Sequence, residues 1–451
     1  MGLKKPNISV VGAGYVGLCT AVGFASRGYR VSVCDVDEKK ISKINQGVAP
    51  FHEPMLQEKL AESIQNGTLK GLVNRVDWII EETDLTFVAV GTPSKADGSI
   101  DLQYIESSSR ELGKALKNED SYHVIVIKST VVPGTTQNVV KPILERESKK
   151  KCGAGFGLCM NPEFLRQGSA FQDTLNAERV VIGSIDKQSG DTLENLYKGF
   201  YGAHMPSLIR TTLSTAELIK YASNAMLATK ISFINTIANI CEQIPGADVK
   251  VVAKAMGLDK RIGPLFLDAG LGYGGSCFPK DVKALIACSK SLGYVPELLA
   301  SVEQVNKTQP LKAVKFCRER LGNLEGKKIA ILGLAFKPDT DDMREARVIP
   351  IVNQLLNEGA NVSAYDPIAT QVAKTIFGNR ISYACSALEC IKNSDACIIV
   401  TEWEEFKKLT PDDYIKNMKQ PVLIDGRRIY DPITYAAKLE FTAIGLGKNV
   451  E

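Results

Sequence analysis

The fold is decided by Ile8-Ser-Val-Val11-Gly12-Ala-Gly14-Tyr-Val-Gly17. A short apolar run with strand character opens directly onto the pattern Gly-x-Gly-x-x-Gly. A helical stretch over 18–27 follows, and then a second strand over 30–34 that ends at Asp35. Strand, glycine turn, helix, strand and acid within about 30 residues are typical of a unit that binds a dinucleotide.

Each glycine of this turn has a separate role. Gly12 allows the tight turn, Gly14 lets a pyrophosphate approach the backbone, and Gly17 lets helix and strand pack closely. Asp35 is placed to bind a ribose diol and would repel a 2′-phosphate, so the predicted cofactor is NAD, although Lys40 could meet a phosphate. The predicted cofactor contacts in this unit are Gly12, Gly14, Tyr15, Val16, Gly17, Asp35 and Lys40.

Further strand-like runs lie at 85–90, 124–127, 156–160 and 180–182, with helical stretches between most of them. This alternation predicts an α/β fold with a parallel, doubly wound sheet, which binds ligands beyond the carboxyl ends of its strands. Turn chemistry alone explains any one polar strand end, but three at consecutive strands predict the wall of a site. They are Gly91-Thr92-Pro93, Lys128-Ser129-Thr130 and Asn161-Pro-Glu163-Phe164-Leu165, with Thr92, Pro93 and Thr130 predicted to contact the cofactor.

The middle of the chain opens with Ser214-Thr-Ala-Glu217, which matches a capping box. No Gly or Pro follows until about residue 241, so we expect one helix of about 28 residues, roughly 40 Å long. A helix of this length is suited to connecting two domains or to forming the core of a dimer. Lys220 and Asn224 are four residues apart and share a face. The alternative for Lys220 is a solvated surface lysine, but the polar neighbours on this helix favour an edge that faces a site.

A glycine-rich loop then leads to a cysteine: Gly270-Leu-Gly-Tyr-Gly-Gly-Ser-Cys277-Phe-Pro-Lys280-Asp281. We name residues 270–277 the cysteine loop. A thiol held in such a loop beside a cation can ionise and attack an electrophile. The alternative is a bystander cysteine, since free Cys behaves mostly as a small hydrophobe. The charged cluster 259–263 upstream is either a solvated loop or an anion contact.

The last part of the chain repeats the first unit without its glycine signature. A strand at 327–332 opens onto Gly333, a helix covers 348–358, and a strand at 361–365 ends in Asp366. Lys337 and Arg344 stand where phosphates would lie. We therefore predict two Rossmann-like doubly wound domains, 1–212 for NAD and 325–451 for a nucleotide-bearing substrate, joined by a helical domain at 213–320 that carries the cysteine loop.

Composition narrows the class of protein. The 451 residues carry a net charge of +4, which is too mild to indicate nucleic acid or a membrane surface as partner. No apolar run reaches the roughly 18 residues of a membrane span. The 11 cysteines form no Cys-x-x-Cys pair, so we expect a reduced, cytoplasmic protein. With only three histidines, no metal is expected, and proton chemistry should fall to carboxylates, lysine or water.

Over essentially its whole length the chain resembles the UDP-glucose 6-dehydrogenase branch of the UDP-glucose/GDP-mannose dehydrogenase family. The motifs that carry the resemblance are Val11-Gly-Ala-Gly-Tyr-Val-Gly17, Asn161-Pro-Glu-Phe-Leu165, Ala216-Glu-Leu-Ile-Lys-Tyr-Ala-Ser-Asn224, Lys230-Ile-Ser-Phe-Ile-Asn235, Arg261-Ile-Gly263, Gly272-Tyr-Gly-Gly-Ser-Cys-Phe-Pro-Lys-Asp281 and Gly333-Leu-Ala-Phe-Lys-Pro-Asp-Thr-Asp-Asp-Met-Arg344. The resemblance implies an NAD-dependent, four-electron oxidation of UDP-glucose to UDP-glucuronate. Cys277 would form a thiohemiacetal and then a thioester, which water hydrolyses.

The resemblance also implies roles for individual residues. Lys220 and Asn224 would hold the developing oxyanion, Asp281 would order or activate water, and Glu163, with Thr130 nearby, would take part in thioester hydrolysis. The predicted substrate contacts are Glu163, Phe164, Leu165, Lys220, Asn224, Arg261, Tyr273, Gly274, Phe336 and Lys337. Lys280 and Arg344 would contact NAD. Arg261 would reach into a neighbouring subunit, which implies a homodimer.

One departure from the family and several alternatives remain open. Many relatives carry a second acid four residues after the position of Glu163, where this chain has Gln167. A sister enzyme would run the same reaction on UDP-N-acetylmannosamine, UDP-N-acetylglucosamine or GDP-mannose. A two-electron hydroxy-acid dehydrogenase would need no Cys277, and an NAD-sensing module would not need Lys220, Cys277 and Asp281 together.

Overall fold

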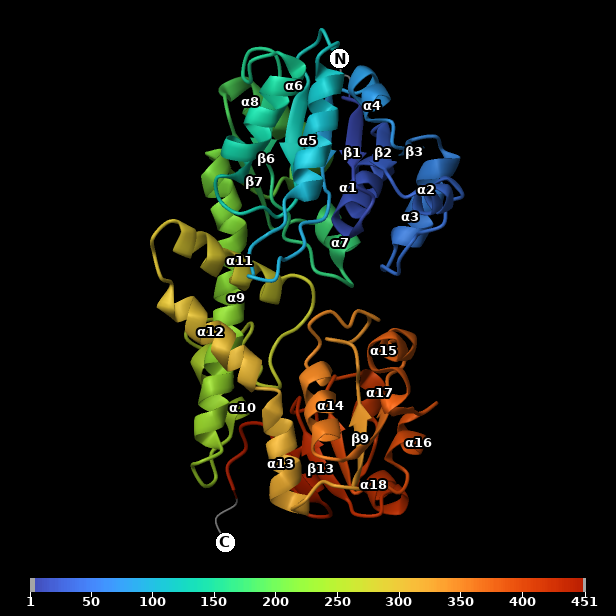
Figure 1. The fold of residues 1–451 in the computed structure, drawn as a ribbon, viewed down its shortest axis with the longest axis vertical. Helices are drawn as coiled ribbons and strands as arrows, with labels where there is room; N and C mark the ends of the chain where they lie inside the picture. The colour runs from blue at the N-terminus through green and yellow to red at the C-terminus, as the bar shows by residue number, and fades with distance from the viewer. Residues whose placement is uncertain (1–4, 449–451) are drawn as a thin grey trace. The chain divides into compact units, whose positions relative to one another are not determined.

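The computed structural model describes residues 5–448, which form two compact units divided between Ser223 and Asn224 (Figure 1). Helix α9 (Leu213–Cys241) begins in the first unit and ends in the second. It confirms the long helix expected from the sequence. The three segments 1–212, 213–320 and 325–451 stay a prediction, because this two-way division does not test them.

The first unit contains an eight-stranded sheet in the order β3-β2-β1-β4-β5-β6-β7-β8. The order reverses between β1 and β4, which is the switch point where such sheets bind ligands. All neighbouring strands are parallel except β6 and β7, which pair antiparallel, so the doubly wound α/β fold has one exception to the expected parallel pairing. The strands are β1 (Ile8–Val11), β2 (Val31–Asp35), β3 (Leu69–Val73), β4 (Leu85–Val88), β5 (Val124–Ile127), β6 (Gly157–Met160), β7 (Arg179–Ser184) and β8 (Ser207–Thr211).

Helices cover both faces of this sheet, so its central strands are buried apolar runs. Alternate residues of β1 point to opposite faces: Val10 packs in one core with Phe24 and Phe87, and Val11 packs in the other with Ile105. The helices of this unit are α1 (Tyr15–Ser26), α2 (Glu38–Asn45), α3 (Leu56–Gln65), α4 (Val76–Glu82), α5 (Gln103–Leu116), α6 (Lys141–Ser148), α7 (Ala170–Leu175) and α8 (Lys187–Tyr201), with a π-helical turn at Thr136–Val140.

The second unit contains a six-stranded parallel sheet in the order β11-β10-β9-β12-β13-β14. Its strands are β9 (Lys328–Leu332), β10 (Asn361–Tyr365), β11 (Ser382–Tyr383), β12 (Ala396–Ile399), β13 (Val422–Asp425) and β14 (Glu440–Ala443). Its helices are α10 (Val249–Gly257), α11 (Phe278–Ser291), α12 (Glu297–Thr308), α13 (Leu311–Leu321), α14 (Val348–Asn357), α15 (Thr370–Phe377), α16 (Ala387–Ile391), α17 (Glu404–Lys407), α18 (Pro411–Asn417) and α19 (Pro432–Ala436).

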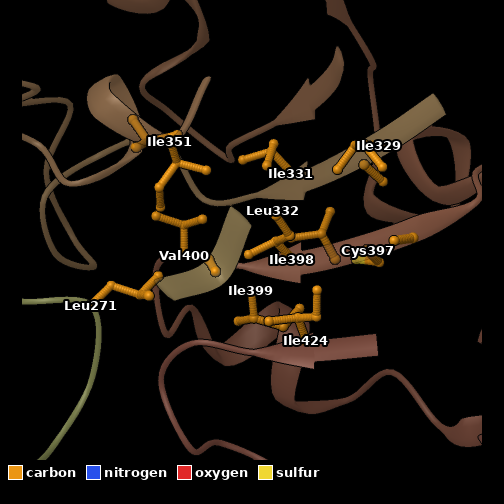
Figure 2. Close-up of a cluster of buried hydrophobic side chains, with 14 of the residues drawn as sticks. Leu271, Ile329, Ile331, Leu332, Ile351, Cys397, Ile398, Ile399, Val400 and Ile424 are labelled. Atoms are coloured by element: carbon orange, nitrogen blue, oxygen red, sulfur yellow. The ribbon is translucent and has the colours of Figure 1, made fainter. Parts of the chain in front are cut away.

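The core of the second sheet also anchors the cysteine loop. Leu271 is fully buried in a cluster with Ile331, Ile398 and Ile424 of the central strands (Figure 2). A Cβ at Gly426 would lie 2.5 Å from the Ile399 carbonyl oxygen and 2.5 Å from the Leu271 side chain, so this position requires glycine. The loop that carries Cys277 is therefore tied at its start to the sheet.

The expected capping box at Ser214 is wrong. Helix α9 already begins at Leu213, so the residue that precedes it is Thr212, whose hydroxyl accepts from the Thr215 N–H at 3.3 Å. Glu217 turns to another segment and accepts from the N–H groups of Gly134 (2.6 Å) and Thr136 (2.7 Å). Burial raises the pKa of the Glu217 carboxyl, despite these bonds.

Among residues 5–448, no helix is both long enough and apolar enough to cross a membrane.

Candidate active site

The glycine turn after β1 leaves space where a dinucleotide would need it. Gly12 has a φ of +99°, and a Cβ there would lie 2.6 Å from the Ala89 carbonyl oxygen. A Cβ at Gly17 would overlap the carbonyl oxygen of Gly12. At Gly14, by contrast, a Cβ would meet no atom within 4 Å, and this residue is the N-cap of α1. The backbone therefore offers an open approach to the N-terminus of a helix, which favours a phosphate.

Asp35 lies at the end of β2, beside this turn. Its carboxylate accepts from the N–H of Ala13 (2.7 Å) and of Asp37 (2.9 Å) and pairs with the Lys40 ammonium at 3.2 Å. Burial would raise the pKa of Asp35, but the two N–H groups and Lys40 outweigh it and lower the pKa. The predicted cofactor residue Lys40 thus faces Asp35 here.

Tyr15 is tied to a segment that sequence reasoning missed. Its hydroxyl donates to the buried carboxylate of Glu53, and its ring stacks on Phe51 with the ring centres 4.6 Å apart. The same carboxylate accepts from Gly168 N–H at 2.9 Å. Glu53 therefore joins the glycine turn to the segment that follows Leu165. Val16, next to Tyr15, is partly buried.

The ends of β4 and β5 are joined by the Ser129 hydroxyl, which donates to the Val90 carbonyl at 2.7 Å. Thr130 and Thr92 are partly buried beside this bond, and Pro93 is exposed. The structure thus places these predicted cofactor residues at the carboxyl ends of two neighbouring strands.

Glu163 and Lys220 form a buried ion pair. The Glu163 Oε1 lies 3.0 Å from the Lys220 Nζ, and Glu163 Oε2 accepts from the Leu165 N–H at 2.6 Å. Burial would raise the pKa of Glu163, but Lys220, the Leu165 N–H and Lys128 lower it, so the carboxylate stays ionised. Phe164 lies beside the pair, since the Lys220 ammonium is 5.6 Å from the centre of its ring.

A second cluster lies within the second unit, at the N-terminus of α11. The buried Asp281 carboxylate accepts from the Asn224 amide at 2.6 Å and from the Lys280 ammonium at 2.5 Å. Cys277 is exposed at the N-cap position of the same helix, where the helix dipole favours a thiolate. The hydrogen-bonded Asp342 carboxylate raises the pKa of the Arg344 guanidinium, and Cys277 adds a smaller effect in the same direction, so this cation lies within electrostatic reach of the thiol.

The cysteine loop is held by amide side chains. Asn235 accepts from the Gly270 N–H at 2.8 Å, and Asn306 both accepts from the Tyr273 N–H (2.8 Å) and donates to its carbonyl (3.1 Å). Gln309 donates to the Gly270 carbonyl at 2.9 Å. No local sequence signal marks Asn306 and Gln309, because their partners lie more than 30 residues away.

Phe336 and the Glu345 carbonyl explain two of the glycines in this loop. A Cβ at Gly275 would lie 2.8 Å from its ring, and a Cβ at Gly274 would lie 2.5 Å from the Glu345 carbonyl oxygen. The Gly275 N–H also donates to the Arg344 carbonyl at 2.9 Å. The segment that follows Gly333 therefore packs directly on the loop that carries Cys277.

Three cationic residues of the second unit that the sequence predicts to contact ligands, Arg261, Lys337 and Arg344, are exposed or partly buried. Arg261 is exposed and pairs with Asp259 at 2.6 Å, while the Arg344 guanidinium pairs with Asp342 at 2.6 Å. The Lys337 ammonium lies 5.7 Å from the centre of the Phe336 ring. These ion pairs would have to open or shift for Arg261 and Arg344 to bind a ligand.

Within each unit the structure thus gathers part of the predicted site. The first contains the glycine turn, Asp35, the strand ends and the Glu163–Lys220 pair. The second contains Asn224, Cys277, Lys280 and Asp281 beside the loop that Phe336 covers. Sequence reasoning missed three residues that support these groups, namely Glu53, Asn306 and Gln309, and it placed Lys128 in the predicted wall of the site without giving it a role.

Three family models match the chain in order. Residues 6–201 match the NAD binding domain of the UDP-glucose/GDP-mannose dehydrogenase family, residues 214–308 its central domain, and residues 330–432 its UDP binding domain. UDP-glucose 6-dehydrogenase AglM of Haloferax volcanii is 44% identical over 424 residues, which are 94% of this chain and 97% of that protein. UDP-glucose 6-dehydrogenase TuaD of Bacillus subtilis is 44% identical over 428 residues, 95% of this chain and 90% of that protein.

Solved structures agree with this similarity. A UDP-glucose dehydrogenase from Pyrobaculum islandicum is 38% identical and has a TM-score of 0.89, with 99% of this chain and 98% of that chain covered. A UDP-D-ManNAc dehydrogenase from Pyrococcus horikoshii is 29% identical with a TM-score of 0.86, covering 97% of this chain and 99% of that chain.

Proposed function

Because the chain belongs to the UDP-glucose/GDP-mannose dehydrogenase family, we propose that it is an NAD-dependent UDP-glucose 6-dehydrogenase that converts UDP-glucose into UDP-glucuronate. The observation that carries this proposal is the exposed Cys277 at the start of α11, beside the network of Asn224, Lys280 and Asp281. Oxidation of an alcohol to an acid removes two hydrides, and a thiol that traps the aldehyde keeps the intermediate bound.

NAD fits the residues of the first unit. A pyrophosphate requires an open approach to a helix N-terminus, which Gly14 and α1 provide. A ribose diol requires a carboxylate, which Asp35 provides. When bound, NAD accepts a hydride in each of the two oxidations. Lys280 and Arg344 are proposed as further contacts of the cofactor, together with Tyr15, Val16, Lys40, Thr92, Pro93 and Thr130.

Cys277 is the proposed nucleophile. Its thiolate adds to the aldehyde carbon, and the oxygen that becomes an alkoxide is stabilised by the Lys220 ammonium and the Asn224 amide. After the second oxidation the acyl group remains on sulfur as a thioester. A water ordered by Asp281, with Glu163 accepting its proton and Thr130 nearby, attacks the acyl carbon and releases the carboxylate and the thiolate.

The substrate contacts follow from the same proposal. A uridine diphosphate needs cations and a flat surface, which Lys337 and Phe336 supply in the second unit. The proposed remaining contacts are Glu163, Phe164, Leu165, Lys220, Asn224, Arg261, Tyr273 and Gly274. The segments 1–212, 213–320 and 325–451 are proposed as the NAD-binding, central and UDP-sugar-binding domains.

A homodimer is proposed from the apolar face of α9 in the second unit. Met226, Phe233 and Ile240 are 59%, 48% and 49% exposed and recur every seven residues, the spacing of a helix–helix contact. The exposed Arg261 would then reach the neighbouring subunit. A cytoplasmic location is proposed because all 11 cysteines are free thiols.

The test counts NADH formed per sugar with limiting UDP-glucose and excess NAD. We expect two NADH per sugar, and turnover lost in Cys277→Ser because a hydroxyl is a far weaker nucleophile. Cys385→Ser, which changes another exposed thiol, is the matched control and should turn over normally. One NADH per sugar, or full turnover without Cys277, would contradict the thioester route.

The alternative substrates form a second arm of this test. The TM-score of 0.86 to a UDP-D-ManNAc dehydrogenase favours including UDP-N-acetylmannosamine, with UDP-N-acetylglucosamine and GDP-mannose beside it. UDP-glucose should give the highest kcat/KM. A higher value with another sugar would keep the chemistry and reassign the substrate.

A further inference from the structure

Lys128 is a buried lysine at the end of β5. Only 8% of the residue is exposed, and its ammonium donates to the Asn161 Oδ1 at 2.9 Å and lies 3.5 Å from the Tyr197 hydroxyl. Within residues 5–448 no carboxylate lies close enough to form an ion pair with it. The Lys128 ammonium is therefore a buried cation whose hydrogen-bond partners are neutral groups.

Such a charge weakens the fold. Removing an ammonium from water is costly unless an anion or enough hydrogen-bond acceptors replace the water. Burial accordingly lowers the pKa of Lys128 to about 8, and the nearby Lys220 lowers it as well, while Glu163 raises it. A buried ionisable group with such a cost, next to a candidate active site, points to a functional role.

Asn161 connects Lys128 to the catalytic segment. Its Oδ1 accepts from Lys128 and also from the Tyr197 hydroxyl at 2.5 Å, and its amide donates to the Val181 carbonyl at 2.8 Å. Asn161 opens the segment that carries Glu163 two residues later. The side chain of Asn161 is thereby fixed from three sides, and Lys128 supplies the one charged contact.

The charges around Lys128 form one group. Glu163 pairs with Lys220 at 3.0 Å, and both Lys220 and Lys128 lower the pKa of the Glu163 carboxyl. Burial raises the pKa of Tyr197 well above its usual value, so this hydroxyl stays neutral. When the Lys220 ammonium turns to the substrate oxyanion, as proposed above, Glu163 loses part of its counter-charge. The charge on Lys128 remains.

We propose that Lys128 is a positioning residue of the reaction, which holds the Glu163 segment through Asn161 and keeps Glu163 ionised while Lys220 serves the substrate. This inference rests on the proposed function. It predicts that Lys128 affects the rate and its pH dependence and contributes little to cofactor binding.

Lys128→Met tests the proposal, because Met keeps the unbranched shape and removes the charge. We expect kcat with UDP-glucose to fall at least tenfold with the KM for NAD unchanged. The acid limb of the kcat–pH profile should move to higher pH, since Glu163 loses a cation that lowers its pKa. Thermal unfolding should occur at no lower temperature than in the wild type, because a buried charge has been removed.

One further variant separates the effect of the charge from the effect of the hydrogen bond to Asn161, and another serves as a control. Tyr197→Phe removes a hydrogen bond to Asn161 without changing charge, so it should lower kcat and leave the acid limb in place. Lys187→Met is the matched control, because this lysine is 88% exposed on α8, and its kcat and pH profile should equal those of the wild type.

Three outcomes would overturn the proposal. They are an unchanged kcat and profile in Lys128→Met, a loss of kcat that comes with a lower unfolding temperature and an unmoved acid limb, and an equal loss in Lys187→Met. Failure of the proposed function is distinguished by the wild type itself, which would then form no NADH from UDP-glucose. An active wild type with an indifferent Lys128 overturns only the role of Lys128.

Discussion

The two sheets share the same kind of turn after a central strand. In each, a central strand, β1 or β9, is followed directly by a glycine with a left-handed backbone, Gly12 at φ +99° and Gly333 at φ +101°. A Cβ on Gly333 would lie 2.5 Å from the Thr401 N, much as one on Gly12 would meet Ala89. The strand that follows also leads to an aspartate: β2 ends at Asp35, and Asp366 comes directly after β10. The two units therefore share the backbone conformation of this turn and the position of the aspartate.

The difference lies in what surrounds the aspartate. Asp366 is 2% exposed, and its carboxylate accepts from the Leu334 and Ala335 N–H groups, from the Trp403 ring and from the Ile368 and Ala369 N–H groups. Asp35 has fewer donors and a side chain that reaches solvent. The same position is thus proposed to bind a ligand in the first unit, whereas in the second unit it binds its own loop.

The fifth strand in each sheet order shows a second contrast. In the first unit β5 is followed by the buried Lys128, and in the second β13 is followed by Gly426, against which Leu271 of the cysteine loop packs. One strand end holds a charge beside Glu163, and the other is bare so that the loop can dock. The second sheet has become a support for the loop of Cys277.

The largest expected effect separates the two aspartates. Asp366→Ala leaves several buried N–H groups without an acceptor and should lower the free energy of unfolding by about 4 kcal/mol. Asp35→Ala should lower it by about 2 kcal/mol or less, because Asp35 accepts from fewer N–H groups and one of them belongs to the exposed Asp37, and should instead weaken NAD binding. Urea unfolding and NAD titration measure the two effects. Equal losses of stability would remove the contrast.

The next effect concerns Lys128 and pH. Its pKa is about 8 in the folded protein, whereas an unfolded lysine titrates near about 10.4. The unfolded state binds more protons between these values, so wild-type stability rises with pH across that window. Lys128→Met should be more stable than the wild type below pH 8, by on the order of 3 kcal/mol, and lose this advantage by about pH 10.4. Urea unfolding at a series of pH values checks this, and parallel curves would contradict it.

The smallest expected effect concerns the open turn. Gly14→Ala meets no protein atom, so stability should change by less than about 1 kcal/mol. The added methyl should obstruct the pyrophosphate and weaken NAD binding about tenfold, or 1.4 kcal/mol. Ala335→Gly in the closed turn of the second unit is the control and should leave NAD affinity unchanged. Unaltered NAD affinity in Gly14→Ala would remove this turn from the cofactor site.

Local patterns were sufficient for the central elements. The inner strands β1, β4, β5 and β9 are buried apolar runs that the sequence predicts, and the long helix α9 is predicted from its lack of Gly and Pro. The strands that were missed, β3, β8, β11 and β14, are the outermost strands of the two sheets. Edge strands are short and partly exposed, so their identity depends on a neighbour rather than on their own residues.

The sequence alone was enough to predict two α/β units and a dinucleotide turn, because glycine geometry and apolar runs are local. It also singled out Cys277 and its neighbours, whose reactivity stays a prediction. Tertiary structure decided that Glu217 binds the N–H groups of Gly134 and Thr136 instead of capping its helix. It also decided that the Asp366 carboxylate binds the N–H groups of its own loop. It also decided that Lys128 lies buried beside Glu163. These outcomes depend on hydrogen-bond partners and burial that arise between residues far apart in the chain, which no local pattern records.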